Sequence, residues 1–122
     1  MSVTHPAAVR SVIADAVTAT IGTSGKIVMQ TSGAVTVATL PFSATAFGAA
    51  SSGVSTANAI TSDTNAVGGT IAKAELQTSG GTAKVLCSVT ATGGGGDITL
   101  SSVVVSAGQT VSLSSLTYTA PL

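Results

Sequence analysis

A run of four glycines followed by an acid, Gly93 to Asp97, could be taken for a phosphate-binding loop. Such loops need a Lys and a Ser or Thr after the glycines, and a helix whose N-terminus receives the anion. Here Asp97 follows, and the next residues, Ile98 to Leu100, are typical of a strand. A carboxylate at that position would repel a phosphate group. We therefore interpret the glycines as a flexible connection between two strands.

A nucleophilic mechanism would depend on the chain's His as the base for a Ser or Thr hydroxyl, or on its Cys as the nucleophile. The chain has a single His, His5, and a single Cys, Cys87, and nucleophilic catalysis needs a base beside the attacking group. His5 precedes Pro6 at the start of an expected helix, so we interpret it as a surface or interface residue. Cys87 alternates with Val85 and Val89, a pattern typical of a small core side chain rather than a reactive thiol.

The carboxylates are scattered along the chain, at Asp15, Asp63, Glu75 and Asp97. One falls in the expected helix, one on a strand and two in loops, so no pair is expected to share acid–base chemistry. Asp63-Thr64-Asn65 resembles a fragment of a calcium-binding loop, but the later Gly and Glu of such a loop are missing. We expect no catalytic, cofactor-binding or metal-binding residues, and we predict that the protein is not an enzyme.

Charge is scarce throughout. Only 7% of residues are charged, and four cations balance four anions, whereas about 25% of residues are charged in an ordinary soluble domain. Zero net charge favours association, and the lack of a basic cluster argues against a nucleic-acid partner. A mean hydropathy of +0.61 argues against disorder. The composition favours a subunit that functions inside an assembly.

The beginning of the chain, MSVTHPAAVRSV, has no basic segment followed by an apolar run, so we expect no secretory signal. No stretch of about 18 apolar residues is present, and we expect no membrane partner. A single Cys excludes an intrachain disulfide. We therefore expect one domain over residues 1–122, made and assembled in a cytoplasm.

Residues 4–21 predict an amphipathic helix. Its apolar positions recur at helical spacing; they are Val9, Val12, Ile13, Ala16, Val17 and Ile21. Thr4 is the expected N-cap and Pro6 fits the first turn, while Gly22 and Gly25 end the helix. Because such a helix is marginal alone in water, we expect its apolar stripe to cover an apolar surface.

Short strands separated by turn residues follow. Two hairpins are expected, 26–30 with 34–40 and 71–77 with 84–90, because Gly-containing turns join alternating segments. Val35 and Val37 are expected on one core face. Further strands are expected at 54–60, 98–105, 111–113 and 116–119. About seven or eight short strands over residues 26–120 predict a mainly β fold, as a sandwich, jelly roll or barrel.

Both phenylalanines lie in one small-residue stretch, LPFSATAFGAASSG, at residues 40–53. Phe42 follows a strand whose core face includes Val37, so we expect it in the core. Phe47 has small neighbours that would permit close approach by another chain. It could therefore lie in the core or at an interface with a partner.

Four segments together resemble the small head-decoration, or cement, proteins of tailed bacteriophages, which are usually encoded beside the major capsid protein. The segments are SVTHPAAVR with its helix, VATLPFSATAFGAASSG, TANAITSDTNAVGGTIAK, and GGGGDITLSS with the closing LSSLTYTAP. They span most of the chain, and the resemblance depends on their order and joint presence.

The resemblance implies a jelly-roll-like β-sandwich with one N-terminal helix, located on the capsid exterior of the virion. Its expected partners are the major capsid protein and copies of itself, as a trimer or, less favoured, a dimer. Expected partner contacts are His5, Arg10, Pro41, Phe47 and Ala49. The alternative is a tail- or fibre-associated module that binds a host glycan or another virion protein, since a surface rich in Ser, Thr and Asn can hydrogen-bond sugars.

Overall fold

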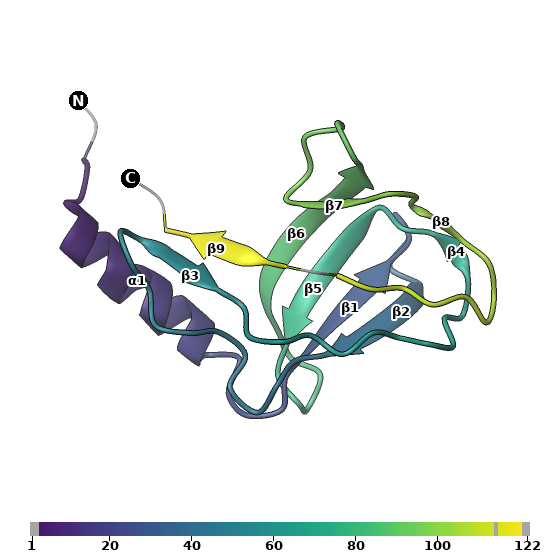
Figure 1. Ribbon diagram of the computed structural model, residues 1–122, viewed down its shortest axis with the longest axis horizontal. Coiled ribbons are helices and arrows are strands. Elements are labelled where there is room, and N and C mark those ends of the chain that lie inside the picture. The colour runs from purple at the N-terminus through teal and green to yellow at the C-terminus, as the bar shows by residue number, and fades with distance from the viewer. Residues whose placement is uncertain (1–2, 114, 121–122) are drawn as a thin grey trace.

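The chain is mainly β, with one helix at one end of the molecule (Figure 1). The structure is a computed structural model that describes residues 3–113 and 115–120. In chain order the elements are α1 (Ala7–Ala19), β1 (Lys26–Gln30), β2 (Thr36–Pro41), β3 (Val54–Thr56), β4 (Gly69–Thr70), β5 (Lys73–Gln77), β6 (Ala83–Ala91), β7 (Ile98–Leu100), β8 (Val104–Val105) and β9 (Thr117–Thr119). The expected mainly β class is confirmed.

The largest sheet is a curled, mixed sheet of five strands in the order β2-β1-β5-β6-β7. Both predicted hairpins are present as antiparallel pairs, β1 with β2 and β5 with β6. Strand β1 joins the two hairpins, because its Ile27 lies opposite Leu40 of β2 on one side and Leu76 of β5 on the other. Val35 does not share the core face with Val37: it precedes β2 and is 62% exposed, because the turn continues through residue 34 with a φ of 67°.

The glycine run connects two parallel strands. β7 runs parallel to β6, with Val89 opposite Ile98, although parallel neighbours usually need a crossover of about a dozen residues or more. Here the chain turns back within residues 92–97. Gly93 and Gly95 make this possible with φ values of 91° and 79°, which residues with a Cβ adopt only under strain.

The same run lies tightly against β6. A Cβ on Gly94 would lie 2.7 Å from the Thr90 side chain, and one on Gly96 would lie 2.9 Å from it. The Asp97 carboxylate accepts hydrogen bonds from the Ser88 N–H at 2.9 Å and hydroxyl at 3.2 Å. The expected connection between strands is therefore confirmed, and its acid holds the loop to β6.

Two short ribbons complete the strands, β3 with β9 and β4 with β8. The predicted strand at 54–60 ends early, at Thr56. Beyond it, the Asn58 backbone N–H donates to the Ala46 carbonyl at 2.9 Å and its side chain donates to the Thr45 carbonyl at 2.8 Å. Asn58 thus makes its hydrogen bonds to residues 45 and 46 instead of extending the pairing of β3 with β9.

The C-terminal strand predictions are partly wrong. The segment 98–105 is broken into β7 and β8, which belong to different sheets. At the break, the Ser102 hydroxyl accepts a hydrogen bond from the Val104 N–H, a local bond that competes with strand pairing. Residues 111–113 form no strand, since Val111 makes only an isolated bridge with Asp63.

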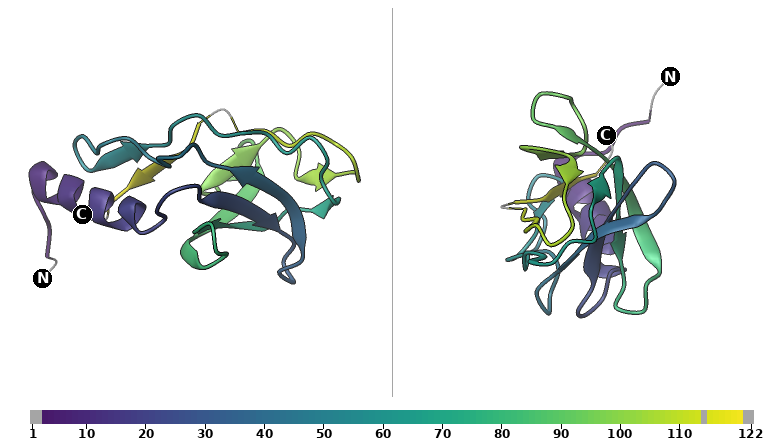
Figure 2. Two further views of the ribbon diagram at one scale, coloured as in Figure 1. Left: turned by 90° about the horizontal axis from the view of Figure 1, so that it is seen from below. Right: turned by 90° about the vertical axis from the view of Figure 1, so that its right-hand side faces the viewer.

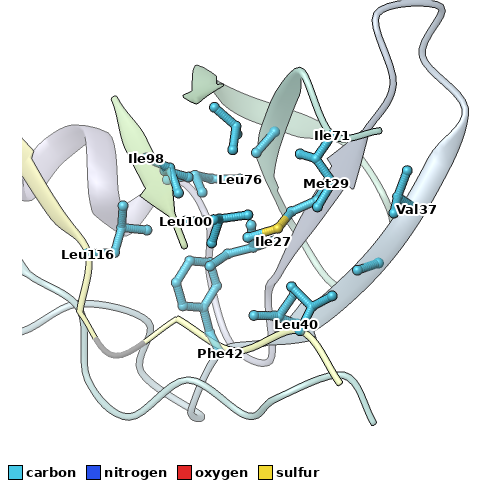
Figure 3. Close-up of a cluster of buried hydrophobic side chains, with 14 of the residues drawn as sticks. Ile27, Met29, Val37, Leu40, Phe42, Ile71, Leu76, Ile98, Leu100 and Leu116 are labelled. Carbon is cyan, nitrogen blue, oxygen red and sulfur yellow. The ribbon is translucent and has the colours of Figure 1, made fainter. Parts of the chain in front are cut away.

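The core lies against the five-stranded sheet and includes both phenylalanines. Phe42 is 5% exposed and Phe47 is 6% exposed. Figure 3 shows the Phe42 ring within the cluster near Leu40 and Leu100. The expectation that Phe42 fills the core is confirmed, and the structure places Phe47 beside it.

Helix α1 is shorter than predicted and starts differently. It begins after Pro6, an extended residue with a ψ of 162° in the N-cap position, without any side-chain cap. Thr4 is therefore not the N-cap; instead the Pro6 carbonyl accepts the N–H groups of Val9 and Arg10. The expected stop is present, because the chain leaves the helix through Gly22 at a φ of 72°.

The predicted apolar stripe is covered by the chain only in part: Ile21 is buried and Ile13 and Val17 are half-buried, whereas Val9, Val12 and Ala16 are exposed. The helix lies along the β3–β9 ribbon (Figures 1 and 2) and buries Ala14 and Thr18 there. The Ser11 hydroxyl accepts the Gly53 N–H at 3.0 Å, and the Asp15 carboxylate accepts the Ala50 N–H at 2.8 Å. The backbone N–H groups of Ala50 and Gly53 thus bind the side of the helix that carries small and polar residues.

Candidate functional site

The five residues expected at a partner interface do not form one surface. His5, Pro41 and Ala49 are exposed, Arg10 is half-buried, and Phe47 belongs to the core. The Arg10 guanidinium donates to the Ala120 carbonyl at 3.4 Å, so it holds the helix to its own chain. Of the two places considered for Phe47, the structure shows the core, and Arg10 is bonded to its own chain; contact of these residues with a partner stays a prediction.

The carboxylates hold loops in place. Asp63 accepts the Thr39 N–H and the Asn65 N–H, both at 2.9 Å, which accounts for the fragment that resembles a calcium loop. Asp15 and Asp97 likewise accept backbone N–H groups. Within residues 3–113 and 115–120, no three His, Cys, Asp or Glu residues are grouped so that they could hold a metal ion.

Cys87 lies on β6 and is half-buried. Burial raises the pKa of its thiol to about 11, and the nearby Asp97 carboxylate adds to the rise. Because the thiolate is the reactive form, this environment suits a packing side chain and not a nucleophile.

The edge of β6 that faces away from β5 is open over its first half. β6 pairs with β7 only from Val89 to Ala91. The backbone N–H of Val89 donates to the Ala72 carbonyl, on the side of β6 that faces β5. The backbone N–H of Ser88 donates to the Asp97 carboxylate, on the other side. Because backbone groups alternate between the two sides of an antiparallel strand, the N–H and C=O of Leu86 point to this open edge.

A groove of about 380 Å³ lies beside the open edge. On the β6 side it is lined by Val85, Leu86 and Cys87, and on the other side by Leu116 to Thr119, including Tyr118. Among the residues that the structure describes, Asp97 is the only charged one that lines the groove, and its carboxylate is hydrogen-bonded to Ser88. The groove is therefore a largely uncharged trough beside unpaired backbone groups.

The opposite wall of the groove is also a free strand edge. β9 pairs with β3. The Leu116 carbonyl accepts the Ala57 N–H, and the Ala120 N–H donates to the Gly53 carbonyl, so the backbone groups of Leu116 and Ala120 face β3. By the same alternation, the backbone groups of Thr117 and Thr119 point away from β3. Both walls of the groove thus present strand groups that have no backbone partner among residues 3–113 and 115–120, which is the arrangement that accepts an added extended segment.

A second uncovered surface is the side of α1 that faces away from the ribbon. We call it the outer face of α1; its residues are Val9, Val12, Ala16 and Ala19, all exposed. Val12 is 68% exposed and Val9 is 41% exposed. Figure 2 shows the helix at the extremity of the molecule, away from the five-stranded sheet, so this face is accessible to another molecule.

The open edge of β6 was not predicted from the sequence, although a signal for it existed, whereas Val9, Val12 and Ala16 of the outer face belong to the predicted stripe. Leu86 stands between Lys84 and Ser88 on the polar face of the predicted hairpin, and it is 73% exposed. A large apolar residue on a solvent-facing strand is the kind of exception that marks an interaction site. The packing side of the helix could not be predicted in this way, because the apolar stripe includes both the buried Ile21 and the exposed Val12.

Comparison of the chain with known protein families, with curated proteins and with solved structures finds no match. In the described residues, no helix has the length and apolar character needed to cross a membrane.

Proposed function

We propose that this protein is a structural component of a tailed-phage virion that binds the outside of the capsid and reinforces contacts between major capsid subunits. The observation that carries the proposal is the open edge of β6 beside its groove. The resemblance of the four sequence segments to head-decoration proteins supports the choice of capsid as partner. The jelly-roll-like sandwich, the virion location and assembly in a host cytoplasm belong to the same proposal.

The open edge would bind an extended segment of a capsid subunit. Such a segment would pair with the backbone N–H and C=O of Leu86, as in strand addition. An apolar side chain of that segment would enter the groove, against Val85, Cys87 and Tyr118. Because the groove offers no unpaired charge, we expect the bound segment to be uncharged.

A decoration protein needs many modest contacts rather than one strong contact. Each copy would bind a lattice of identical capsid subunits, and linked contacts on a lattice gain strength through effective concentration. The scarcity of charge and the use of carboxylates to bind backbone N–H groups fit this non-catalytic role. The proposal assigns the protein no reaction, no cofactor and no nucleic acid.

The test is rebinding of the purified protein to phage heads that have been stripped of it. Wild-type protein is expected to rebind and to restore resistance to heat and low salt. Leu86→Pro removes the N–H that points to the open edge, and proline is tolerated on an edge strand. We expect this variant to bind at least about tenfold more weakly, while its thermal melt shows that it remains folded.

Leu86→Thr is the matched control, because it removes the large side chain but keeps the N–H. It should bind more tightly than Leu86→Pro. If folded Leu86→Pro binds like the wild type, the open edge is not the capsid site; if wild-type protein does not rebind at all, the capsid function is wrong. Electron micrographs in which labelled protein decorates tails would favour the tail-associated alternative.

A further inference from the structure

The outer face of α1 combines apolar residues at a regular spacing. Val9, Val12, Ala16 and Ala19 follow one another at intervals of three, four and three residues, the interval of the a and d positions at which paired helices meet. All four are exposed, so the seam that they form is not covered by the chain itself.

None of the four seam residues is charged. Of the two charged residues of the helix, Arg10 lies on the side away from the seam and Asp15 lies at its edge beside Val12 and Ala19, and each is hydrogen-bonded to its own chain. Arg10 donates to the Ala120 carbonyl, and Asp15 accepts the Ala50 N–H. A partner for this face must therefore be apolar, uncharged and small enough in side chain to approach a helix closely.

We propose that the outer face of α1 binds the same face of a second copy, with the two helices antiparallel across a two-fold axis. The valines occupy the first half of the seam and the alanines occupy the second half. In the antiparallel arrangement Val9 faces Ala19 of the second copy, and Val12 faces Ala16. Each layer then contains one large and one small side chain, which is the pattern that packs without voids.

The parallel arrangement lacks this complementarity. It would place valine on valine in one half and alanine on alanine in the other, so that the alanine half would be loosely packed. It would also align the two helix dipoles, whereas the antiparallel pair opposes them. The seam therefore favours a two-fold dimer over the trimer that the resemblance implies.

The pair is expected to be weak in free solution. Helix α1 has 13 residues, which is about 20 Å at 1.5 Å per residue. Two helices of this length bury less surface than the roughly 1,600 Å² of a standard interface. We expect dissociation in the micromolar range or above, and a sedimentation coefficient that rises with protein concentration.

The first test compares two valines of nearly equal exposure. Val12 is 68% exposed on the seam, and Val67 is 66% exposed in a loop elsewhere. Val12→Asp is expected to raise the dimer dissociation constant by at least about tenfold, measured by sedimentation velocity, whereas Val67→Asp leaves it unchanged. Equal melting temperatures verify that both variants fold. A wild-type protein that stays monomeric at millimolar concentration, or a Val12→Asp variant that dimerises normally, would overturn the proposal.

The second test determines the direction of the helices. In a Cys87→Ser background, proteins carrying Val12→Cys and Ala16→Cys are oxidised separately and as a mixture. Antiparallel packing predicts a disulfide-linked dimer only in the mixture, because residue 12 faces residue 16. Crosslinking of Val12→Cys alone would indicate parallel helices and overturn the arrangement. Both tests use the isolated protein, so their failure is distinct from a failure of capsid binding at the open edge of β6.

Discussion

The ring centroids of Phe42 and Phe47 lie 5.6 Å apart, with the ring planes inclined by 50°. This tilted contact joins two parts of the 40–53 stretch inside the core. The backbone of Phe42 forms an isolated β-bridge with Ile60, and that of Phe47 with Ala57, so the same two residues also join this stretch to the segment that follows β3.

Removal of either ring should destabilise the monomer. Phe42→Ala and Phe47→Ala are each expected to lower the free energy of unfolding by about 3–5 kcal/mol, since both side chains are buried and few other large groups are available to fill the space. Urea denaturation measures this change. A loss below about 1 kcal/mol for Phe47→Ala would contradict its burial in the monomer.

A methyl group on Gly96 should disturb the crossover from β6 to β7. Its Cβ would lie 2.9 Å from the Thr90 hydroxyl, and overpacking of this kind costs about 1–3 kcal/mol. Gly33→Ala is the control, because its nearest neighbour would lie 3.8 Å away. Thermal unfolding should show a lower melting temperature for Gly96→Ala alone; equal values for the two variants would argue against the tight contact with Thr90.

Gly53 should be essential for seating α1 on the β3–β9 ribbon. Its φ is 80°, and a Cβ there would lie 2.9 Å from the Cβ of Arg10. Gly22→Ala is the matched control, since Gly22 has a φ of 72° and open space around it. We expect Gly22→Ala to cost about 1–2 kcal/mol from backbone strain and Gly53→Ala to cost more. Hydrogen exchange should rise in α1 only for Gly53→Ala, and unchanged protection there would count against the contact.

Cys87 should react slowly with thiol reagents. With its pKa raised to about 11, its thiolate fraction near neutral pH is roughly 300-fold below that of an ordinary cysteine with a pKa of about 8.5. Alkylation of the folded protein at pH 8, compared with the same protein in guanidinium, measures this difference. Equal rates would show that the thiol is not shielded.

The same shift predicts a loss of stability in alkali. The folded-state pKa of Cys87 lies above the value of about 8.5 expected in the unfolded chain, so the unfolded state loses its proton first as the pH rises. The stabilising contribution is fully present below about pH 8.5 and is lost as the pH approaches 11. A Cys87→Ser variant should lack this part of the pH dependence.

The two hairpins and the burial of Phe42 could be predicted because local alternation and turn residues determine them. β1 was predicted with its observed bounds, Lys26–Gln30, since the strand is flanked by glycine on one side and a tight turn on the other. The broken segment after Leu100 was not predictable in this way, because a hydroxyl of Ser102 ends the strand through a local bond.

The candidate surfaces depend on tertiary arrangement and were harder to predict. The apolar stripe of α1 correctly indicated helix, but the side that packs was selected by Ser11 and Asp15, which meet backbone donors from a distant segment. Likewise, the open edge of β6 exists because β7 begins only at Ile98, and pairing lengths cannot be deduced from alternation alone.

The contact between Arg10 and Ala120 spans 110 residues of sequence, and this determines when the helix can settle during biosynthesis. The hairpins of the large sheet join neighbouring segments and can form while translation continues. Helix α1 cannot, because the ribbon that receives it requires β9, which is made after all the other strands. Until then the side of α1 that packs on the ribbon remains uncovered, so an element made before every strand is fixed in place only after the last of them.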